Sequence, residues 1–405
     1  MAAAIPMLPP MCGVATSQTS DSQVVSTQSQ TGDVQSAQTL GVNDVSDQTV
    51  VTTSATGDSL SASVETGSLG VQSVQSMQGA AAASTELDVV TNAGPTVSLT
   101  TAATGNTGEA DNVSGGSTLN AGIAQTTGQV SITASSVINA STAQAGDMSV
   151  TSQAIANTQG LGVAGGSIGA TVSQSSAALT QANSTAVLQY TPGTAEFVTT
   201  AVSNNVTATG IQGSAQALDL TQSMTGQRTQ AAQFLALGQG QDVSNAATAT
   251  ANNISVSNDG GLLDVVSAQD NESYVRGQAE STSYSFGAST AIATGVGNSA
   301  VYGEAGGQIS VNNTQTNSGG VEVIASSGGS SGYDLASSAT AMGNAVTGYA
   351  CSACGGVMSV GNSQTNAADL SARSGISFDG AARSATSTAT AVGNTATFYV
   401  SKPSS

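Results

Sequence analysis

The chain repeats itself about every 48 residues along its whole length, and this period constrains the fold more than any other feature. One mark of the repeat is an Asn or Asp that follows a small or amide residue: Asp58, Asn106, Asn157, Asn205, Asn253, Asn298, Asn344 and Asn394. The second mark is a Gln that follows the first at a nearly constant spacing: Gln75, Gln125, Gln174, Gln222, Gln269, Gln315 and Gln364, with Gln28 ahead of them. A fixed period of this length means a stacked architecture, in which no unit buries its apolar face alone.

Several short segments align without any choice of phase. Residues 291–298 read AIATGVGN, residues 338–344 read SATAMGN and residues 388–394 read TATAVGN. Residues 310–317 and 359–366 read SVNNTQTN and SVGNSQTN. The repeat is therefore visible in whole segments as well as in single marked residues.

Large apolar side chains and charges are both scarce. Aromatic residues make up 3% and charged residues 7% of the chain, with Trp 0 and His 0. An ordinary soluble domain carries about 25% charged residues and builds its core from large aliphatic and aromatic side chains. This composition argues against one large globular core and favours narrow, layered β structure.

Runs that alternate an apolar with a small polar residue recur, as in residues 130–133 and 254–257. Such alternation is typical of half-buried strands. We predict an all-β fold, an elongated β-solenoid (β-helix) built of about eight repeats of about 48 residues. Helix formers cluster locally at residues 79–88 and 225–237. An eight-bladed propeller is the alternative, which the few aromatic residues disfavour.

Each repeat forms either one large coil or two smaller coils of half its length, which strands of ordinary length would allow. Sixteen of the smaller coils, at about 4.8 Å each, would give a rod of roughly 75–80 Å. In either case the marked residues fall in register, and identical amide side chains hydrogen-bond along the stack. We expect the Asn or Asp to occupy turns with difficult backbone angles, and the Gln to form an internal or surface ladder.

Three segments follow from the pattern. Residues 1–15 are apolar and end in small residues, as a truncated secretion signal would, and a simple unstructured N-terminus is the alternative. Residues 16–50 are a polar entry or a partial first repeat, and residues 51–405 are the solenoid repeats. No stretch approaches the length of apolar sequence that a membrane-spanning helix needs.

The cysteines Cys351 and Cys354 have CxxC spacing. A zinc site needs two more ligands, and the chain has no His to supply them. We expect a local disulfide between these two, or two small buried thiols. No metal or cofactor is predicted.

The residue inventory limits the chemistry. A net charge of −19 with five Lys plus Arg argues against nucleic acid. The absence of His excludes Ser-His-Asp and Cys-His catalysis. A carboxylate pair remains open in an acidic stretch that also contains Tyr274 and Tyr284; its acids are Asp259, Asp264, Asp270, Glu272 and Glu280. A solvated acidic patch is the simpler interpretation, so we predict no enzyme.

The tandem units that end at Asn344 and Asn394, with a looser copy ending at Asn298, resemble the holdfast-anchor protein HfaD family. The similarity is clearest over residues 285–405 and rests elsewhere on composition and period. The phased Asn and Gln are also similar, more distantly, to the curlin repeat. The resemblance implies a cell-surface protein, outer membrane-associated or extracellular. Its implied partners are a polysaccharide adhesin, other surface anchor or curlin-like subunits and an outer-membrane export pore.

The resemblance therefore implies a non-enzymatic structural protein that anchors an adhesive polysaccharide, the holdfast, to the outer envelope. Many weak contacts to the polysaccharide, repeated along the stiff stack of strands, would together give tight binding. The first alternative is a functional amyloid or fibre-forming adhesin subunit, for which self-assembly would be the main activity. The second is a polysaccharide-acting enzyme, which would need acids clustered on one face.

Overall fold

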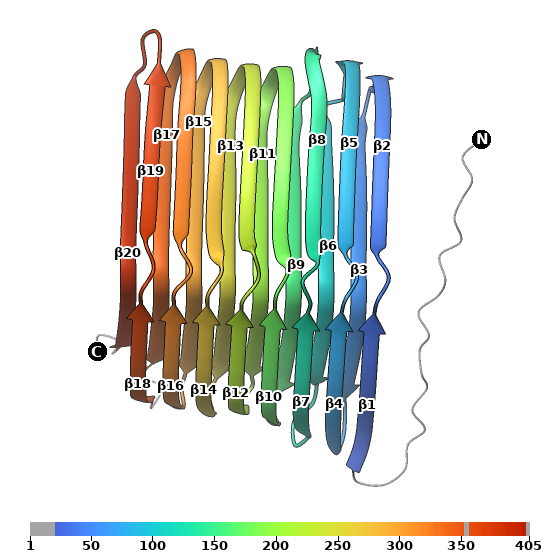
Figure 1. Ribbon diagram of the computed structural model, residues 1–405, viewed down its shortest axis with the longest axis vertical. Coiled ribbons are helices and arrows are strands. Elements are labelled where there is room, and N and C mark those ends of the chain that lie inside the picture. Colours follow the sequence, from blue (N-terminus) through green and yellow to red (C-terminus); the bar gives the residue numbers. More distant parts are fainter. Residues whose placement is uncertain (1–20, 352–355, 402–405) are drawn as a thin grey trace, which may run out of the picture.

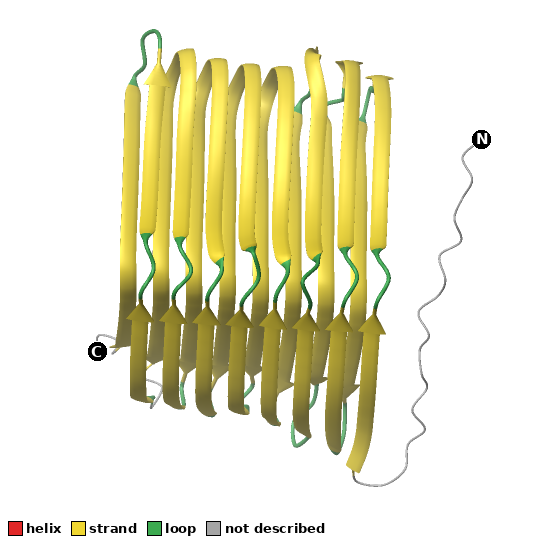
Figure 2. Ribbon diagram, viewed as in Figure 1, coloured by secondary structure: helices red, strands yellow, loops and turns green. Residues whose placement is uncertain are grey.

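The computed structural model describes residues 21–351 and 356–401, and every regular element in them is a β-strand (Figure 1). The strands are drawn in yellow in Figure 2, joined by short green turns. Neighbouring strands pair in parallel, for example β1 with β4 and β13 with β15. The all-β prediction is confirmed, and the parallel sheets are consistent with a β-solenoid.

The strands form three rows. The first row, called the short sheet, is an eight-stranded sheet: β1 (Asp21–Gln30), β4 (Ser68–Met77), β7 (Thr118–Thr127), β10 (Ser167–Ser176), β12 (Ala215–Met224), β14 (Leu262–Asn271), β16 (Gln308–Asn317) and β18 (Val357–Asn366). It occupies the lower front of Figure 1.

The second row, called the upper row, continues above it and contains β2 (Val34–Asp44), β5 (Ala81–Asn92), β8 (Ser131–Gln144), the first halves of β11 (Leu179–Ile211), β13 (Arg228–Asp259), β15 (Tyr274–Ala305) and β17 (Val321–Cys351), and β19 (Leu370–Phe378). The third, called the back row, contains β3 (Gln48–Val64), β6 (Thr96–Asn112), β9 (Asp147–Ala164), the second halves of the four long strands and β20 (Ser384–Ser401). The back row faces both other rows across the interior.

Residues that pair between adjacent strands are separated by close to one full repeat in sequence. Gln28 and Gln75 are 47 apart, and Asn106 and Asn157 are 51 apart. Of the two coil sizes left open by the sequence, the smaller one is therefore wrong, because the chain passes through all three rows before it returns to its starting row. The expected rod of sixteen coils is wrong too. Eight strands span roughly 35 Å, and the longest axis of the molecule instead runs along the strands (Figure 1).

Residues 79–88 and 225–237, where helix formers cluster, form no helix. β5 begins at Ala81 and β13 at Arg228. Ala81, Ala83 and Ala231 are buried in a cluster made largely of Ala from the facing rows. Tertiary burial here outweighs local helix propensity, which is a weak preference.

The interior is thin and divides into three apolar clusters. The first lies where the back row turns into the short sheet, and the third where the upper row turns into the back row. The middle cluster is mostly Ala, so the facing layers approach closely there. The largest fully buried side chains include Tyr302 and Phe197. This explains how a chain with few large residues still has a continuous core.

The predicted signal segment 1–15 lies outside the described residues. Of residues 16–50, those from 21 onward are described, and β1 and β2 pair with β4 and β5 in the same register as later strands. Within residues 21–351 and 356–401 there is no helix of the length and apolarity that a membrane crossing needs.

Candidate functional site

The marked Gln residues form one buried row inside the molecule. Each side-chain amide donates from Nε2 to Oε1 of the preceding Gln at 2.7–2.8 Å, as Gln222 does to Gln174. Each also donates to a backbone carbonyl of the back row, which for Gln222 is Asn253 O at 2.9 Å. Both amide hydrogens of each interior Gln are thus used, and the row ties the short sheet to the back row. Its members are Gln28, Gln75, Gln125, Gln174, Gln222, Gln269, Gln315 and Gln364.

A second row runs through the back-row strands with opposite polarity. Nδ2 of Asn106 donates to Oδ1 of Asn157 at 2.7 Å, and the same bond links each later member to its successor at 2.8 Å. The row consists of Asp58, Asn106, Asn157, Asn204, Asn252, Asn298, Asn344 and Asn394. These residues lie within strands, so the expectation that they occupy turns is wrong.

Two of the Asn residues that mark the repeat in the sequence, Asn205 and Asn253, lie one residue away from this row. Asn204 and Asn252 point inward, whereas Asn205 and Asn253 are half-exposed and bond each other at 2.8 Å. The prediction that Asn205 and Asn253 belong to the row is therefore wrong by one residue in each Asn-Asn pair. The residue before each row member is small throughout, because a Cβ there faces the next strand. At Gly297 an added Cβ would lie 2.6 Å from Gly343 O.

Cys351 is the last residue of β17 and is buried. Cys354 lies outside the described residues, so the disulfide between them stays a prediction. Among the described residues, no three Cys, Asp or Glu side chains gather in a way that would hold a metal ion.

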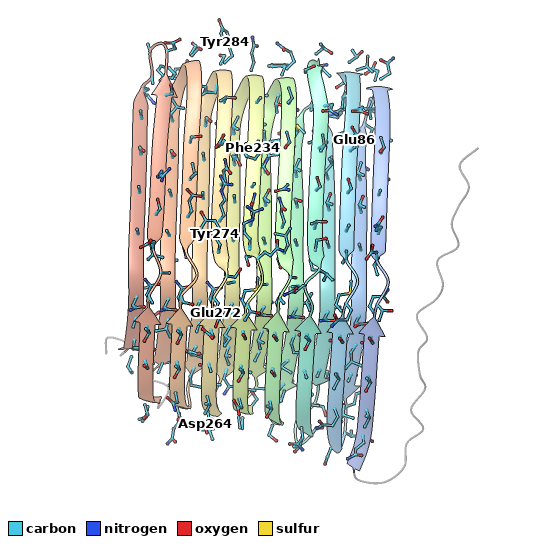
Figure 3. All side chains as sticks on the ribbon, in the orientation of Figure 1. Glu86, Phe234, Asp264, Glu272, Tyr274 and Tyr284 are labelled. Atoms are coloured by element: carbon cyan, nitrogen blue, oxygen red, sulfur yellow. The ribbon has the colours of Figure 1, made fainter. Side chains whose placement is uncertain are left out.

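The acidic stretch of the sequence does not become one patch. Asp264 lies at the bottom of the molecule in Figure 3, Glu272 and Tyr274 near the middle, and Tyr284 at the top. Asp264 and Asp270 are six residues apart on β14, which separates them by roughly 20 Å. The two carboxyl groups of a glycosidase lie about 5–9.5 Å apart. This pair is too far apart for that chemistry.

Three hollows lie next to one another over the corner where the upper row turns into the back row. In β11 they are lined in succession by residues 187–189, 190–192 and 194–196. In β13 and β15 the same three hollows are lined by residues 236–244 and by positions within 282–290. We call residues 187–196, 236–244 and 282–290 the corner surface. It is continuous over three adjacent strands.

Tyrosine rings stand exposed along this corner. Tyr284 is 69% exposed, Tyr190 40%, and Tyr333, which lines the same hollow in the next strand, 63%. Phe286 is buried beneath them, and an added Cβ at Gly329 or Gly332 would clash with its ring. Its ring also makes an edge-on contact with Phe378, with centroids 6.1 Å apart. The buried ring and the facing glycines therefore set the shape of the corner.

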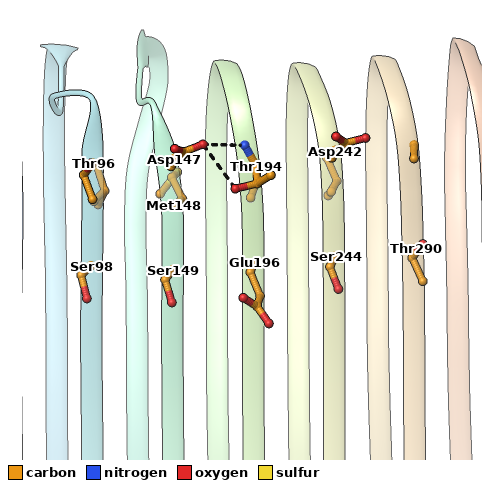
Figure 4. A pocket seen from close by; sticks show the side chains of 14 residues that line it. Thr96, Ser98, Asp147, Met148, Ser149, Thr194, Glu196, Asp242, Ser244 and Thr290 are labelled. Atoms are coloured by element: carbon orange, nitrogen blue, oxygen red, sulfur yellow. Dashed lines mark hydrogen bonds between the residues drawn. The ribbon is translucent and has the colours of Figure 1, made fainter.

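Hydroxyl and carboxylate groups line the third hollow, which has a volume of about 690 Å³. Figure 4 shows them in two rows across the strands, with Asp147, Thr194 and Asp242 in one row and Glu196 beside Ser149 and Ser244 in the other. Asp147 Oδ1 accepts hydrogen bonds from Thr194 N at 2.9 Å and Thr194 Oγ1 at 3.3 Å. Such groups accept and donate hydrogen bonds to a ligand rich in hydroxyls, and they repeat about every 4.8 Å along the stack.

A family model for holdfast attachment protein D matches residues 43–320. The chain belongs to the holdfast attachment protein D family. Membership implies a role in holdfast attachment at the cell surface. Searches of curated proteins and of solved structures give no match.

The part of the chain that matches holdfast attachment protein D includes the whole corner surface. The sequence analysis did not predict this surface, although the spacing of the aromatic residues indicated it. Tyr190, Tyr284, Phe286, Tyr333 and Phe378 all follow the marked Gln of their repeat at similar distances along the chain. In a chain with so few Phe and Tyr, this shared phase indicates one location in the fold.

Proposed function

We propose that this protein is a non-enzymatic anchor, outer membrane-associated or extracellular, that holds an adhesive polysaccharide to the outer envelope through its corner surface. In this proposal the chain is a solenoid of about eight turns, with one repeat of the sequence forming each turn. The observation that carries the proposal is the continuity of the three hollows across adjacent strands of a holdfast attachment family member.

The corner chemistry suits a sugar polymer. Exposed tyrosine rings offer rigid apolar faces with a polar tip, and the apolar faces of pyranose rings stack on such surfaces. Ser149, Ser244 and Glu196 offer hydrogen-bonding groups beside them. The repeat along the stack presents similar contacts to successive sugars, so many weak contacts add up as avidity.

The buried amide rows support a mechanical role. Each interior Gln joins its two neighbours in the row and the back row, so tension on one strand is carried by several hydrogen bonds. Charged surface is acidic over most of the molecule. The described cations are Arg228, Arg276, Arg373 and Arg383, too few for a phosphate backbone. We therefore propose partners other than nucleic acid: the adhesive polysaccharide, further anchor or curlin-like subunits, and an export pore in the outer membrane.

The first experiment replaces Tyr190, Tyr284 and Tyr333 together by Ala. Removing three rings at roughly 1 kcal/mol each should weaken binding to purified adhesive polysaccharide about a hundredfold. Cells with this variant should still make the adhesive but shed it into the medium. The matched control is Tyr274→Ala, a half-exposed tyrosine far from the corner (Figure 3).

Two results would contradict the proposal in different ways. If cells that lack the protein keep their adhesive, anchoring is wrong. If those cells shed it but the triple variant restores retention, anchoring stands and the corner surface is not the binding site. A fibre-forming subunit, the alternative function, would instead show loss of filaments as the primary defect.

A further inference from the structure

Both ends of the stack expose strands that are paired on one side only. At one end these are β1, β2 and β3, and at the other β18, β19 and β20 (Figure 1). They match in length, with 10, 11 and 17 residues against 10, 9 and 18. Exposed strand edges pair readily with another strand. Stacked-repeat proteins usually cover their ends with polar capping repeats, and the described residues contain none.

The apolar interior reaches both ends. Val24 and Val34 at the first end, and Val360 and Leu370 at the other, pack against the buried clusters but are only half-buried themselves. Val360 and Val24 occupy one position of the short-sheet register. Leu370 and Val34 occupy one position of the upper row. The two ends of the molecule therefore expose apolar side chains at equivalent positions.

The two amide rows end with complementary groups. Gln28 donates to Ser59 O but to no preceding Gln, and among the described residues nothing donates to Gln364 Oε1. In the other row Asn394 accepts from Asn344 and has an Nδ2 without a described partner, while Asp58 presents a carboxylate. A donor at one end thus corresponds to an acceptor at the other in both rows. The opposite polarity of the rows makes this match specific to a head-to-tail arrangement.

Charge follows the same pattern. Ala385 and Thr49 share one position of the back-row register, and Arg383 and Asp47 lie two residues before them, just outside the first residues of β20 and β3. Both side chains are exposed. Arg383 is already paired with Asp334, but a guanidinium has five donors and can serve a second carboxylate.

We propose that the partner of each end is a second copy of this chain, stacked head to tail so that β18, β19 and β20 of one copy pair with β1, β2 and β3 of the next. Both amide rows, the apolar interior and the parallel sheets then continue through the junction. Arg383 of one copy lies beside Asp47 of the next. The folded copies join through native strand edges, without refolding into a different cross-β structure. A stack of copies also repeats the corner surface along its length.

A charge swap tests the junction directly. The full chain is purified and its association is measured by analytical ultracentrifugation over a concentration series. Wild type should form head-to-tail particles. Arg383→Glu and Asp47→Arg should each weaken association at least about tenfold, because like charges then meet at the junction. The double variant, with both changes in one chain, should recover it.

The control is Asp264→Arg, which changes the net charge by the same amount as Asp47→Arg but lies exposed on β14, away from both ends of the stack. Circular dichroism and thermal unfolding verify that each variant folds. The proposal is overturned if wild type remains monomeric over the series, or if the two single variants associate as wild type does. A third result also overturns it: wild type is monomeric, and removal of residues 1–20 permits association. In that case the chain's own N-terminal segment, and not a second copy, occupies the end.

Discussion

Asp58 is the one acid in a row of asparagines, and its position leaves two acceptors facing each other. Asp58 Oδ2 and Asn106 Oδ1 are buried, and neither has a hydrogen-bond partner among the described residues. Burial raises the pKa of the Asp58 carboxyl above its ordinary value, against the opposing effect of backbone hydrogen bonds from Ser76 and Gln30. A proton on Asp58 would supply the donor that the row lacks.

An acid with a raised folded-state pKa contributes stability that is fully present below its ordinary pKa. That stability is lost as the pH rises through the folded value. Asp58→Asn supplies a donor at every pH, so we expect it to stabilise the protein at pH 7 by about 1–3 kcal/mol. The gain should shrink at acid pH. Urea unfolding at both pH values measures it, with exposed Asp264→Asn as the control. A gain that is equal at both pH values would contradict this explanation.

The Gln row makes a second prediction at this scale. Gln222→Ala leaves Gln174 Oε1 without its donor, Gln269 Nε2 without its acceptor and Asn253 O without its side-chain donor. Each buried group left unsatisfied costs about 1–3 kcal/mol. We expect a loss of several kcal/mol by urea unfolding, while exposed Thr221→Ala on the same strand should stay within about 1 kcal/mol. Similar losses for both variants would show that the row contributes little.

At the scale of the element, the long strands pass over the corner without a break. β11, β13, β15 and β17 each belong to both the upper row and the back row. Pro192 and Gly193 coincide with a register shift between Thr191 and Thr194 in β11. In β15 the bend is filled by Phe286. The positions of the exposed tyrosines therefore depend on the buried residues beneath them.

Gly332→Ala tests this dependence. The new methyl group would clash with the Phe286 ring, and overpacking of this kind costs about 1–3 kcal/mol. We expect a lower melting temperature and weaker polysaccharide binding. The matched control is Gly375→Ala on β19, where an added Cβ meets nothing within 4 Å. Combining Gly332→Ala with Phe286→Leu should recover part of the loss, and a failure to do so would locate the strain elsewhere.

At the scale of the whole molecule, stability is spread along the stack, because each strand contacts the strands beside it and the layer across the interior. β14 pairs with β12 and β16 only, and β15 with β13 and β17. Stability in such a fold is close to a sum of repeat and neighbour terms. The net charge of −19 opposes association through the side faces. It leaves the two ends as the favoured contacts, because Arg383 at one end and Asp47 at the other carry opposite charges.

Deletions test whether one circuit of the chain uses one repeat. Removing residues 262–307 takes out β14 and β15 and brings Gln308 to the row position of Leu262, with which it pairs. Every remaining row residue keeps its place, so we expect a folded, slightly smaller protein. Removing residues 262–284 shifts the following strands by half a circuit and should unfold them. Circular dichroism and hydrogen exchange distinguish the two, and equal stability of both deletions would rule out the single-circuit arrangement.

The amino-acid sequence by itself determined the parallel stack and the identity of its rows, because a residue that recurs at a constant interval must fall in register when strands stack. The sequence also indicated which Asn of each Asn-Asn pair belongs to the buried row. Ser203-Asn204 and Ala251-Asn252 follow the rule of a small residue before an Asn, and a strand points only one of two adjacent side chains inward. The phased aromatic residues likewise marked the corner.

Only the tertiary structure decided how much of the chain completes one circuit and which surfaces meet. The circuit depends on where facing layers can pack, and the Ala-rich middle of the interior brings the back row against both other rows. This packing places Asp264 at the bottom and Tyr284 at the top of the molecule as seen in Figure 3, and it assembles the corner surface from segments far apart in sequence. Local patterns set register, whereas contacts across the interior set shape, and the shape decides which side chains share a site.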